Sequence, residues 1–211
     1  MLKIKIIEVT PFAENCRILY DEQNHEAVVC DPGDAASLIK SALDGLGCKL
    51  KAILITHGHL DHIGAVADLK ELNEAPVIGP AKDDAFLVQG ILGQSRMLGL
   101  KSCKSFSPRY VSDGETLQLF SDPKLVIKVI ATPGHTPGGV CFYFEQEKIL
   151  LSGDTVFYGS VGRSDLPGGD EETLIGSVRK VLSLPDDTKI CPGHGPDTTV
   201  EFERRYNPYA E

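Results

Sequence analysis

The chain has 211 residues, of which 42% are hydrophobic and 24% are charged, and its formal net charge is −9. This length predicts one domain over residues 1–211 with a sizeable core, and the acidic balance argues against nucleic acid or an anionic membrane as partner. No apolar run approaches the ~18 residues of a spanning helix, and residues 1–6 do not have the layout of a signal peptide, so we expect a cytoplasmic protein.

Ten segments have the composition of β-strands. They are rich in Ile, Val and Leu, they are separated by turn residues, and they cover 2–9, 15–20, 26–31, 50–56, 108–112, 116–120, 124–131, 139–145, 148–153 and 188–191. Cys16, Cys30 and Cys141 fall within these runs, where buried thiols are common. The six cysteines include no C-x-x-C pair, which is consistent with a reducing compartment.

Helices are predicted over 34–45, 61–73, 81–98, 170–183 and 199–206. Two further stretches are predicted to be loops near a site. The first, 91–105, overlaps the end of the third helix and has little periodicity, and the second is 157–169. Strands come first, helices and strands then alternate, and the pattern repeats roughly after residue 105. This order favours an α/β fold with two sheets and outer helices over a single doubly wound sheet.

Five of the six histidines lie in three glycine-rich loops, and each loop follows a predicted strand. The loops are Thr56-His57-Gly58-His59-Leu60-Asp61-His62, Thr132-Pro133-Gly134-His135-Thr136-Pro137-Gly138 and Cys191-Pro192-Gly193-His194-Gly195. A fourth strand end is followed by Asp154. Histidine and carboxylate side chains pooled at strand ends suit a cation such as zinc or iron. The sequence therefore predicts a metal centre, and the number of ligands favours two metals.

The first loop offers ligands in two directions. His57 and His59 are one residue apart, so an extended backbone can point both towards one metal. Asp61 and His62 enter the next predicted helix, where the change in backbone direction can aim them at a second metal. Gly58 permits the tight course of the loop.

The four motifs T-H-G-H-L-D-H, P-G-H-T-P-G, S-G-D-T and P-G-H-G-P resemble, in this order and spacing, the metallo-β-lactamase superfamily. The match spans nearly the whole chain. An aspartate at position 154, rather than a cysteine, resembles the glyoxalase II (hydroxyacylglutathione hydrolase) branch, and in particular compact bacterial proteins without its C-terminal helical region. The resemblance implies a four-layer αβ/βα sandwich with two mixed sheets flanked by helices.

The resemblance also implies the ligand set. One metal would be held by His57, His59 and His135, the other by Asp61, His62 and His194, and Asp154 would bridge both. Zinc is the first expectation for the two divalent ions, with iron and manganese as alternatives.

The expected reaction is hydrolysis of a glutathione thioester of the S-lactoylglutathione type, with Asp61 and Asp154 as catalytic residues. Two cations ~3.5–4 Å apart lower the pKa of a bridging water towards ~7, and the resulting hydroxide can attack a carbonyl. A thiol of pKa ~8.5 leaves readily as thiolate. The sequence has no G-x-S-x-G nucleophile motif, which agrees with attack by water.

Two residues are candidates for substrate binding. Arg163 matches the basic glutathione-contacting position of the family, although the aromatic residue expected two positions later is Asp165 here. Tyr158 can line the pocket or simply pack. The expected partner is a small-molecule thioester, and the chain is expected to be a monomer or a homodimer.

Other functions stay open at this point. Gly162-Arg163-Ser164-Asp165 also resembles the persulfide dioxygenase branch of the superfamily, in which His57, His135 and Asp154 would hold a single iron. A non-catalytic metal-binding module is disfavoured because all seven ligands are present. The bridging carboxylate fits β-lactam hydrolysis poorly, and the acidic balance disfavours an RNA-processing nuclease.

Overall fold

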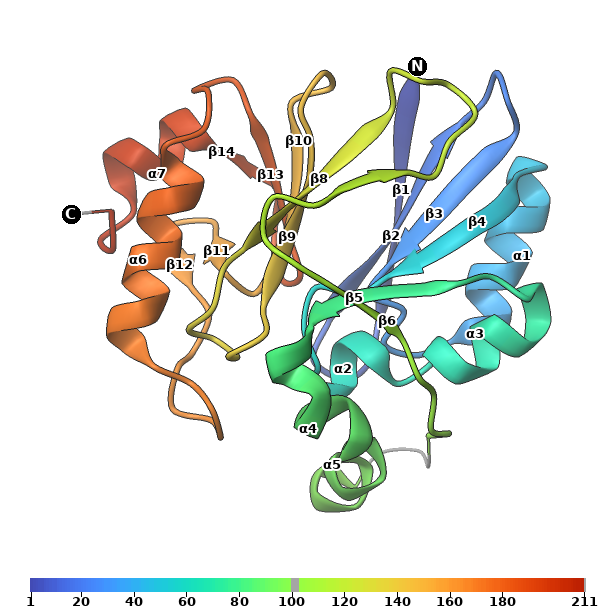
Figure 1. Cartoon of the computed structure of the whole chain (residues 1–211), viewed down its shortest axis with the longest axis horizontal. Helices are drawn as coiled ribbons and strands as arrows, with labels where there is room; N and C mark the ends of the chain where they lie inside the picture. Colours follow the sequence, from blue (N-terminus) through green and yellow to red (C-terminus); the bar gives the residue numbers. More distant parts are fainter. Residues whose placement is uncertain (100–102, 211) are drawn as a thin grey trace.

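Two β-sheets lie face to face in the middle of the computed structural model, which describes residues 1–99 and 103–210, and helices cover both outer faces (Figure 1). The first sheet has the strand order β1-β2-β3-β4-β5-β6, and the second has the order β14-β13-β10-β9-β8-β7. This arrangement confirms the expected four-layer sandwich.

The first sheet is antiparallel from β1 to β3 and parallel from β3 to β6. Its strands are β1 (Leu2–Val9), β2 (Glu14–Asp21), β3 (Glu26–Cys30), β4 (Lys49–Leu54), β5 (Val77–Ala81) and β6 (Arg109–Val111).

The second sheet is antiparallel except for the parallel pair β10–β13, so both sheets are mixed as expected. Its strands are β7 (Thr116–Gln118), β8 (Val126–Ala131), β9 (Val140–Phe144), β10 (Ile149–Gly153), β13 (Lys189–Pro192) and β14 (Thr198–Thr199). A separate small hairpin is formed by β11 (Val156–Phe157) and β12 (Ser160–Val161).

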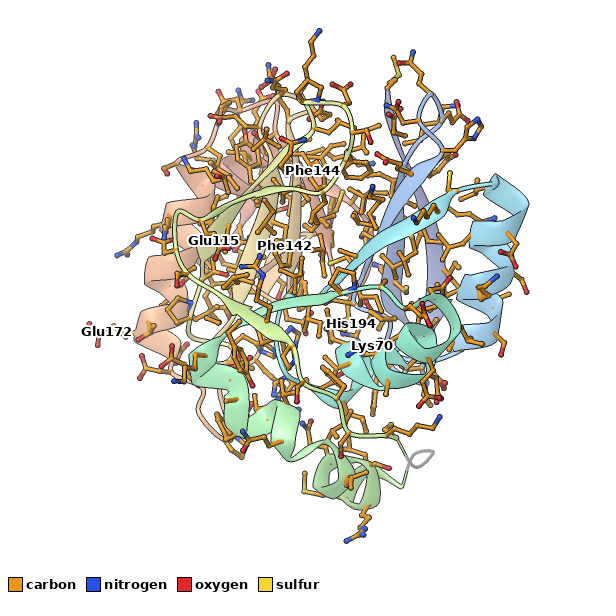
Figure 2. All side chains as sticks on the ribbon, turned by 45° about the vertical axis from the view of Figure 1, so that its right-hand side comes forward. Lys70, Glu115, Phe142, Phe144, Glu172 and His194 are labelled. Carbon is orange, nitrogen blue, oxygen red and sulfur yellow. The ribbon has the colours of Figure 1, made fainter. Side chains whose placement is uncertain are left out.

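Three apolar layers hold the sandwich together. Burial of apolar surface, worth ~25 cal/mol per Å², drives their formation. Phe142 and Phe144 of β9 lie between the two sheets (Figure 2). Side chains of α1 and α3 cover the first sheet, and side chains of α6 and α7 cover the second. The helices are α1 (Ala36–Leu46), α2 (Leu60–Ile63), α3 (Val66–Asn73), α4 (Ala85–Gln89), α5 (Ile91–Leu98), α6 (Glu171–Leu182) and α7 (Val200–Tyr206), with a 3₁₀ turn η1 (Lys82–Asp84).

Strand β5 was not predicted, because Gly79-Pro80 in its middle is typical of a turn. Proline cannot donate to a strand ladder. The register between β5 and β6 shifts between Ile78 and Ala81, so Pro80 lies at the irregularity rather than in the regular ladder. The two-residue strands β11, β12 and β14 were also absent from the prediction.

The single helix predicted over 61–73 is wrong, since α2 and α3 are separated at Gly64-Ala65. The Ala65 N–H donates to the Pro32 carbonyl at 2.9 Å, and a Cβ on Gly64 would stand 2.3 Å from the Gly33 carbonyl oxygen. The chain therefore bends where it passes the loop after β3.

The helix predicted over 81–98 is divided into η1, α4 and α5. The loop predicted over 91–105 is wrong for 91–98, which form α5, and part of that prediction falls on 100–102, outside the described residues. None of the described helices has the length and apolar character needed to cross a membrane.

The topology explains why the histidine loops meet. Strand β4 of the first sheet, and β8, β10 and β13 of the second, each lead into one of the four motifs. In the second sheet β8 and β10 are both antiparallel to β9, and β13 is parallel to β10, so these three strands point the same way. Their carboxyl ends share one edge of the sandwich.

Candidate metal centre

The first ligand triad, His57, His59 and His135, converges on one point. His57 Nε2 lies 3.2 Å from His135 Nε2, and His59 Nδ1 lies 2.9 Å from the same atom. Nitrogens bound tetrahedrally to zinc at ~2.1 Å would be ~3.4 Å apart. The three imidazoles therefore already have nearly the spacing that a single cation requires.

The second triad, Asp61, His62 and His194, lies beside the first. Asp61 Oδ2 is 3.4 Å from His194 Nε2 and 4.0 Å from His62 Nε2. His62 is fully buried, whereas His194 is partly exposed, so this triad reaches from the interior to the mouth of the site.

Asp154 stands between the two triads. Its Oδ1 is 3.3 Å from His62 Nε2, and its Oδ2 is 3.6 Å from the Nε2 atoms of both His135 and His194. Asp154 Oδ1 and His62 Nε2 are buried and have no hydrogen-bond partner among the described residues. Buried polar atoms of this kind are rarely unpaired, so they fit metal ligands that await a cation. The structure thus brings together all seven residues of the expected ligand set.

Hydrogen bonds on the outer side of the rings orient four of the histidines. His57 Nδ1 lies 3.1 Å from the Thr56 hydroxyl oxygen. His135 and His194 each donate through Nδ1 to a backbone carbonyl, at 2.6 and 3.0 Å. His62 donates through Nδ1 to Asp31 Oδ2 at 3.1 Å. Carbonyl and carboxylate oxygens carry no hydrogen, so Nδ1 of His62, His135 and His194 must be the protonated nitrogen of the neutral ring. The Nε2 lone pair of each of these three rings then faces the centre, as in known metal sites.

The protonation states also suit a cation. Burial, reinforced by the neighbouring imidazoles, lowers the pKa of His57 well below its ordinary value and that of His59 to about 4. Burial opposes ionisation of Asp61, but His62 and His194 outweigh it and lower its pKa. At neutral pH His57 and His59 are therefore neutral imidazoles and Asp61 is a carboxylate, which are the forms that ligate metals. Burial opposes ionisation of His62, but the carboxylates of Asp154 and Asp61 outweigh it and raise its pKa, so a bound cation would take the place of a proton there.

Asp31 supports the centre and was missed by the sequence reasoning. It follows β3 and accepts hydrogen bonds from Thr56 N at 2.8 Å, from Thr56 Oγ1 at 2.7 Å and from His62. A signal was available, because Asp31 is the last residue of the strand predicted over 26–31, much as Asp154 follows the strand predicted over 148–153. Glu14 lies on the same side of His62, 3.9 Å from its Nδ1. Burial raises the pKa of Glu14 well above its ordinary value.

Asp84 and Gln94 fasten the first histidine loop and were also missed. Asp84 accepts from Gly58 N at 2.8 Å and from Gly138 N at 2.6 Å, and so ties the first histidine loop to the second. Gln94 of α5 accepts from Leu60 N and donates to the Gly58 carbonyl, both at 3.0 Å. Their local sequence is typical of an ordinary helix, and their role depends on tertiary contacts.

One glycine is required by a close approach. A Cβ on Gly193 would stand 2.4 Å from Asp154 Oδ1 and 2.6 Å from His62 Cε1. Any side chain at position 193 would therefore displace two metal ligands.

The two expected substrate residues lie outside the ligand cluster. The Arg163 carbonyl accepts the bond from His135 Nδ1, but its exposed guanidinium pairs with Asp165, with Nε 2.6 Å from Oδ1. Tyr158 is 52% exposed and stacks on Phe202, with ring centroids 4.6 Å apart. Both are accessible, and neither is held towards the metal ligands.

Comparison with known proteins agrees with this geometry. Residues 9–194 match the model of the Metallo-beta-lactamase superfamily. A hydroxyacylglutathione hydrolase, GloC of Haemophilus influenzae, is 38% identical over 99% of this chain and 98% of its own length.

Three solved structures with the same fold are described by different functions or metal contents. A B3 metallo-beta-lactamase, BLEG-1, is 36% identical, with a TM-score of 0.88 over 99% of each chain. TTHA1623 in a di-iron-bound form is 38% identical, with a TM-score of 0.87 over 97% of this chain and 99% of its own. ETHE1 from Myxococcus xanthus is 25% identical, with a TM-score of 0.78 over 99% of this chain and 84% of its own.

Proposed function

This chain belongs to the metallo-beta-lactamase superfamily, and on that premise we propose that it is a metal-dependent hydrolase of glutathione thioesters of the S-lactoylglutathione type. The products would be a hydroxy acid and a free thiol. The observation that carries the proposal is the meeting of two complete ligand triads at Asp154. Similarity to the GloC hydrolase over nearly the full length supports it.

The chain's own residues would divide the work as follows. One cation would be held by His57, His59 and His135, the other by Asp61, His62 and His194, and Asp154 would contact both. When bound, such a pair supplies an activated water and polarises a carbonyl. Asp61 and Asp154 would supply the two carboxylates of the ligand set. Zinc remains the first expectation, and the likeness to a di-iron-bound protein favours iron as the alternative.

Water is the nucleophile that the protein environment favours. Cys141 lies beneath the site, hydrogen-bonded through Sγ to the Ser152 carbonyl at 3.7 Å. Burial raises its pKa to about 11, so the thiol is not ionised at neutral pH. The Thr155 hydroxyl donates to Thr132 Oγ1 at 3.0 Å instead of facing a base. None of these described groups is activated for attack on a carbonyl.

We assign the thiol carrier to the side of Arg163. Glutathione carries two carboxylates, and an exposed guanidinium is the natural partner for one of them. Because Asp165 already pairs with Arg163, the substrate carboxylate would have to displace it. Tyr158, with half of its ring exposed, can contact the same carrier.

The second candidate function is oxidation of glutathione persulfide by a mononuclear iron. The loop Gly162-Arg163-Ser164-Asp165 and the likeness to ETHE1 favour it. The likeness to BLEG-1 adds β-lactam hydrolysis as a third reaction to be measured.

One set of assays on a single metal-analysed sample separates the three reactions. We expect loss of the thioester of S-lactoylglutathione, with two metals per chain, and neither oxygen uptake with glutathione persulfide nor cleavage of a penicillin. Oxygen uptake by protein with one iron per chain would establish the dioxygenase instead. The Asp154→Ala variant, assayed in parallel, shows whether any observed activity belongs to this centre.

A further inference from the structure

A hollow of about 110 Å³ opens to solvent beside Asp61. It lies between the turn after β1, the loop after β3 and the joint between α2 and α3. The lining residues that matter here are Thr10, Gly33, Asp34, Asp61, Asp68 and Cys103. Neither Arg163 nor Tyr158, the two expected substrate residues, is among the residues that line it.

The hollow adjoins the metal centre at Asp61. Asp61 lines it and also faces His194 across 3.4 Å. The turn that contributes Thr10 also supplies the Phe12 carbonyl that accepts from His194 Nδ1 at 3.0 Å. Gly33 lies directly against Asp61, since a Cβ on it would stand 1.6 Å from the Asp61 carbonyl oxygen. The hollow therefore lies beside the second triad, within reach of a molecule bound over it.

The charge of the hollow is one-sided. Besides Asp61, whose carboxylate we assign to a cation, Asp34 and Asp68 contribute carboxylates, and the described lining residues include no lysine or arginine. Lys104 pairs with Asp68 at 3.0 Å and also with Glu71, so this cation offsets part of the negative charge. The rest of the wall is largely apolar and includes Leu60, Ala36 and Ala65. Neutral or cationic groups are compatible with such a lining, whereas like charges are repelled.

We infer that this hollow receives the acyl group of the thioester and that Asp34 and Asp68 select acyl groups without negative charge. The inference rests on the proposed thioester hydrolysis. Glutathione brings two carboxylates, which the acidic hollow would reject and which Arg163, beyond His135, can receive. His135 and Asp61 belong to different triads, so a substrate lying across both would place its carrier at one end and its acyl group at the other.

The kinetic test compares two thioesters of the same carrier. We expect kcat/KM for S-lactoylglutathione to exceed that for S-succinylglutathione, whose acyl group is anionic, by about tenfold, equivalent to ~1.4 kcal/mol of like-charge repulsion. The Asp34→Asn/Asp68→Asn double variant should reduce this ratio to within about threefold of unity. The control is Asp187→Asn, which removes an exposed carboxylate paired with Lys148 and should leave the ratio unchanged.

A second readout needs no turnover, because Cys103 lines the hollow. Its alkylation by neutral iodoacetamide and by anionic iodoacetate can be followed by mass spectrometry of the Cys103 peptide. We expect the ratio of the iodoacetamide rate to the iodoacetate rate at Cys103 to be about tenfold higher in the folded protein than in the denatured chain, because of the same like-charge repulsion. This ratio should fall in the double variant.

The outcomes separate the two proposals. Turnover of both thioesters with equal efficiency would overturn the acyl assignment and keep the thioesterase. If neither thioester is cleaved, the thioesterase proposal and the acyl assignment that rests on it are both overturned. Charge-selective alkylation of Cys103 in that case would still show that the hollow prefers uncharged groups, which would belong to another substrate. Alkylation without charge preference would overturn the role of Asp34 and Asp68.

Discussion

Replacing Asp31 by asparagine should weaken the second metal site more than the first. The carboxylate holds Thr56 N through Oδ1, and it holds Thr56 Oγ1 and His62 Nδ1 through Oδ2. If the asparagine oxygen keeps the bond to the backbone N–H, its amide NH₂ faces His62. Nδ1 must then accept, and the hydrogen moves to Nε2, the atom that faces the centre.

The expected loss can be estimated from this change of tautomer. Removing the group that orients a metal-binding histidine typically lowers metal affinity about 10- to 100-fold, or ~1.4–2.8 kcal/mol. Asp31 reaches the first site only indirectly, because the Thr56 hydroxyl that it holds lies 3.1 Å from His57 Nδ1, so the first site should lose less affinity than the second. The variant has nearly the same shape as aspartate, so the fold should be retained.

The assay is a metal titration that resolves two binding steps. Binding is detected by calorimetry or, with cobalt as the metal, by its visible absorption spectrum. The control is Asp113→Asn, since Asp113 also accepts a backbone N–H, from Ala131 at 2.7 Å, but lies on the surface away from the centre. Two binding steps of unchanged affinity in Asp31→Asn would refute the assignment of His62 to the second metal.

Three further predictions concern activity, substrate binding and pH. Asp154→Ala should lower thioester cleavage by several orders of magnitude while far-ultraviolet circular dichroism stays unchanged, because the residue follows a strand end; near-normal turnover would place the chemistry elsewhere. Arg163→Ala should raise KM for S-lactoylglutathione about tenfold with kcat within a few-fold, since a contact remote from the carbonyl acts equally in the ground and transition states; an unchanged KM would make Arg163 a solvated loop charge. Burial opposes ionisation of Glu26, but hydrogen bonds from Lys51 and Ser121 outweigh it and lower its pKa to about 2 from 4.5. The ionised carboxylate therefore stabilises the fold above pH 4.5, and this contribution is lost as the pH falls towards 2. Glu26→Gln should therefore lower the melting temperature at pH 7 and have little effect near pH 2, and an equal effect at both would contradict this cause.

Most of the sandwich was predictable because its strands are apolar runs with clear ends. Segment 2–9 coincides with β1, and 148–153 differs from β10 by one residue. The failures occur where tertiary contacts override local pattern. Strand β5 contains Gly79-Pro80 and exists because β4 and β6 pair with it on either side. The break between α2 and α3 follows from contacts with the loop after β3, which no local sequence pattern reveals.

The ligand residues were predictable because metal chemistry restricts their type and spacing. Asp31 was detectable in principle as a carboxylate after a strand. Asp84 was not, since its role depends on joining loops that are 80 residues apart in sequence, at Gly58 and Gly138. The acidic hollow could not be predicted either, because its walls come from segments between Thr10 and Cys103 that only the fold brings together.

The most direct test of the account is the initial rate of S-lactoylglutathione cleavage as metal is added to metal-free protein in known equivalents. If the two triads act as a pair bridged by Asp154, the rate should stay low through the first equivalent, rise through the second and become constant at two metals per chain. A rate that becomes constant at one equivalent, or no cleavage with two metals bound, would contradict the two-metal thioester hydrolase.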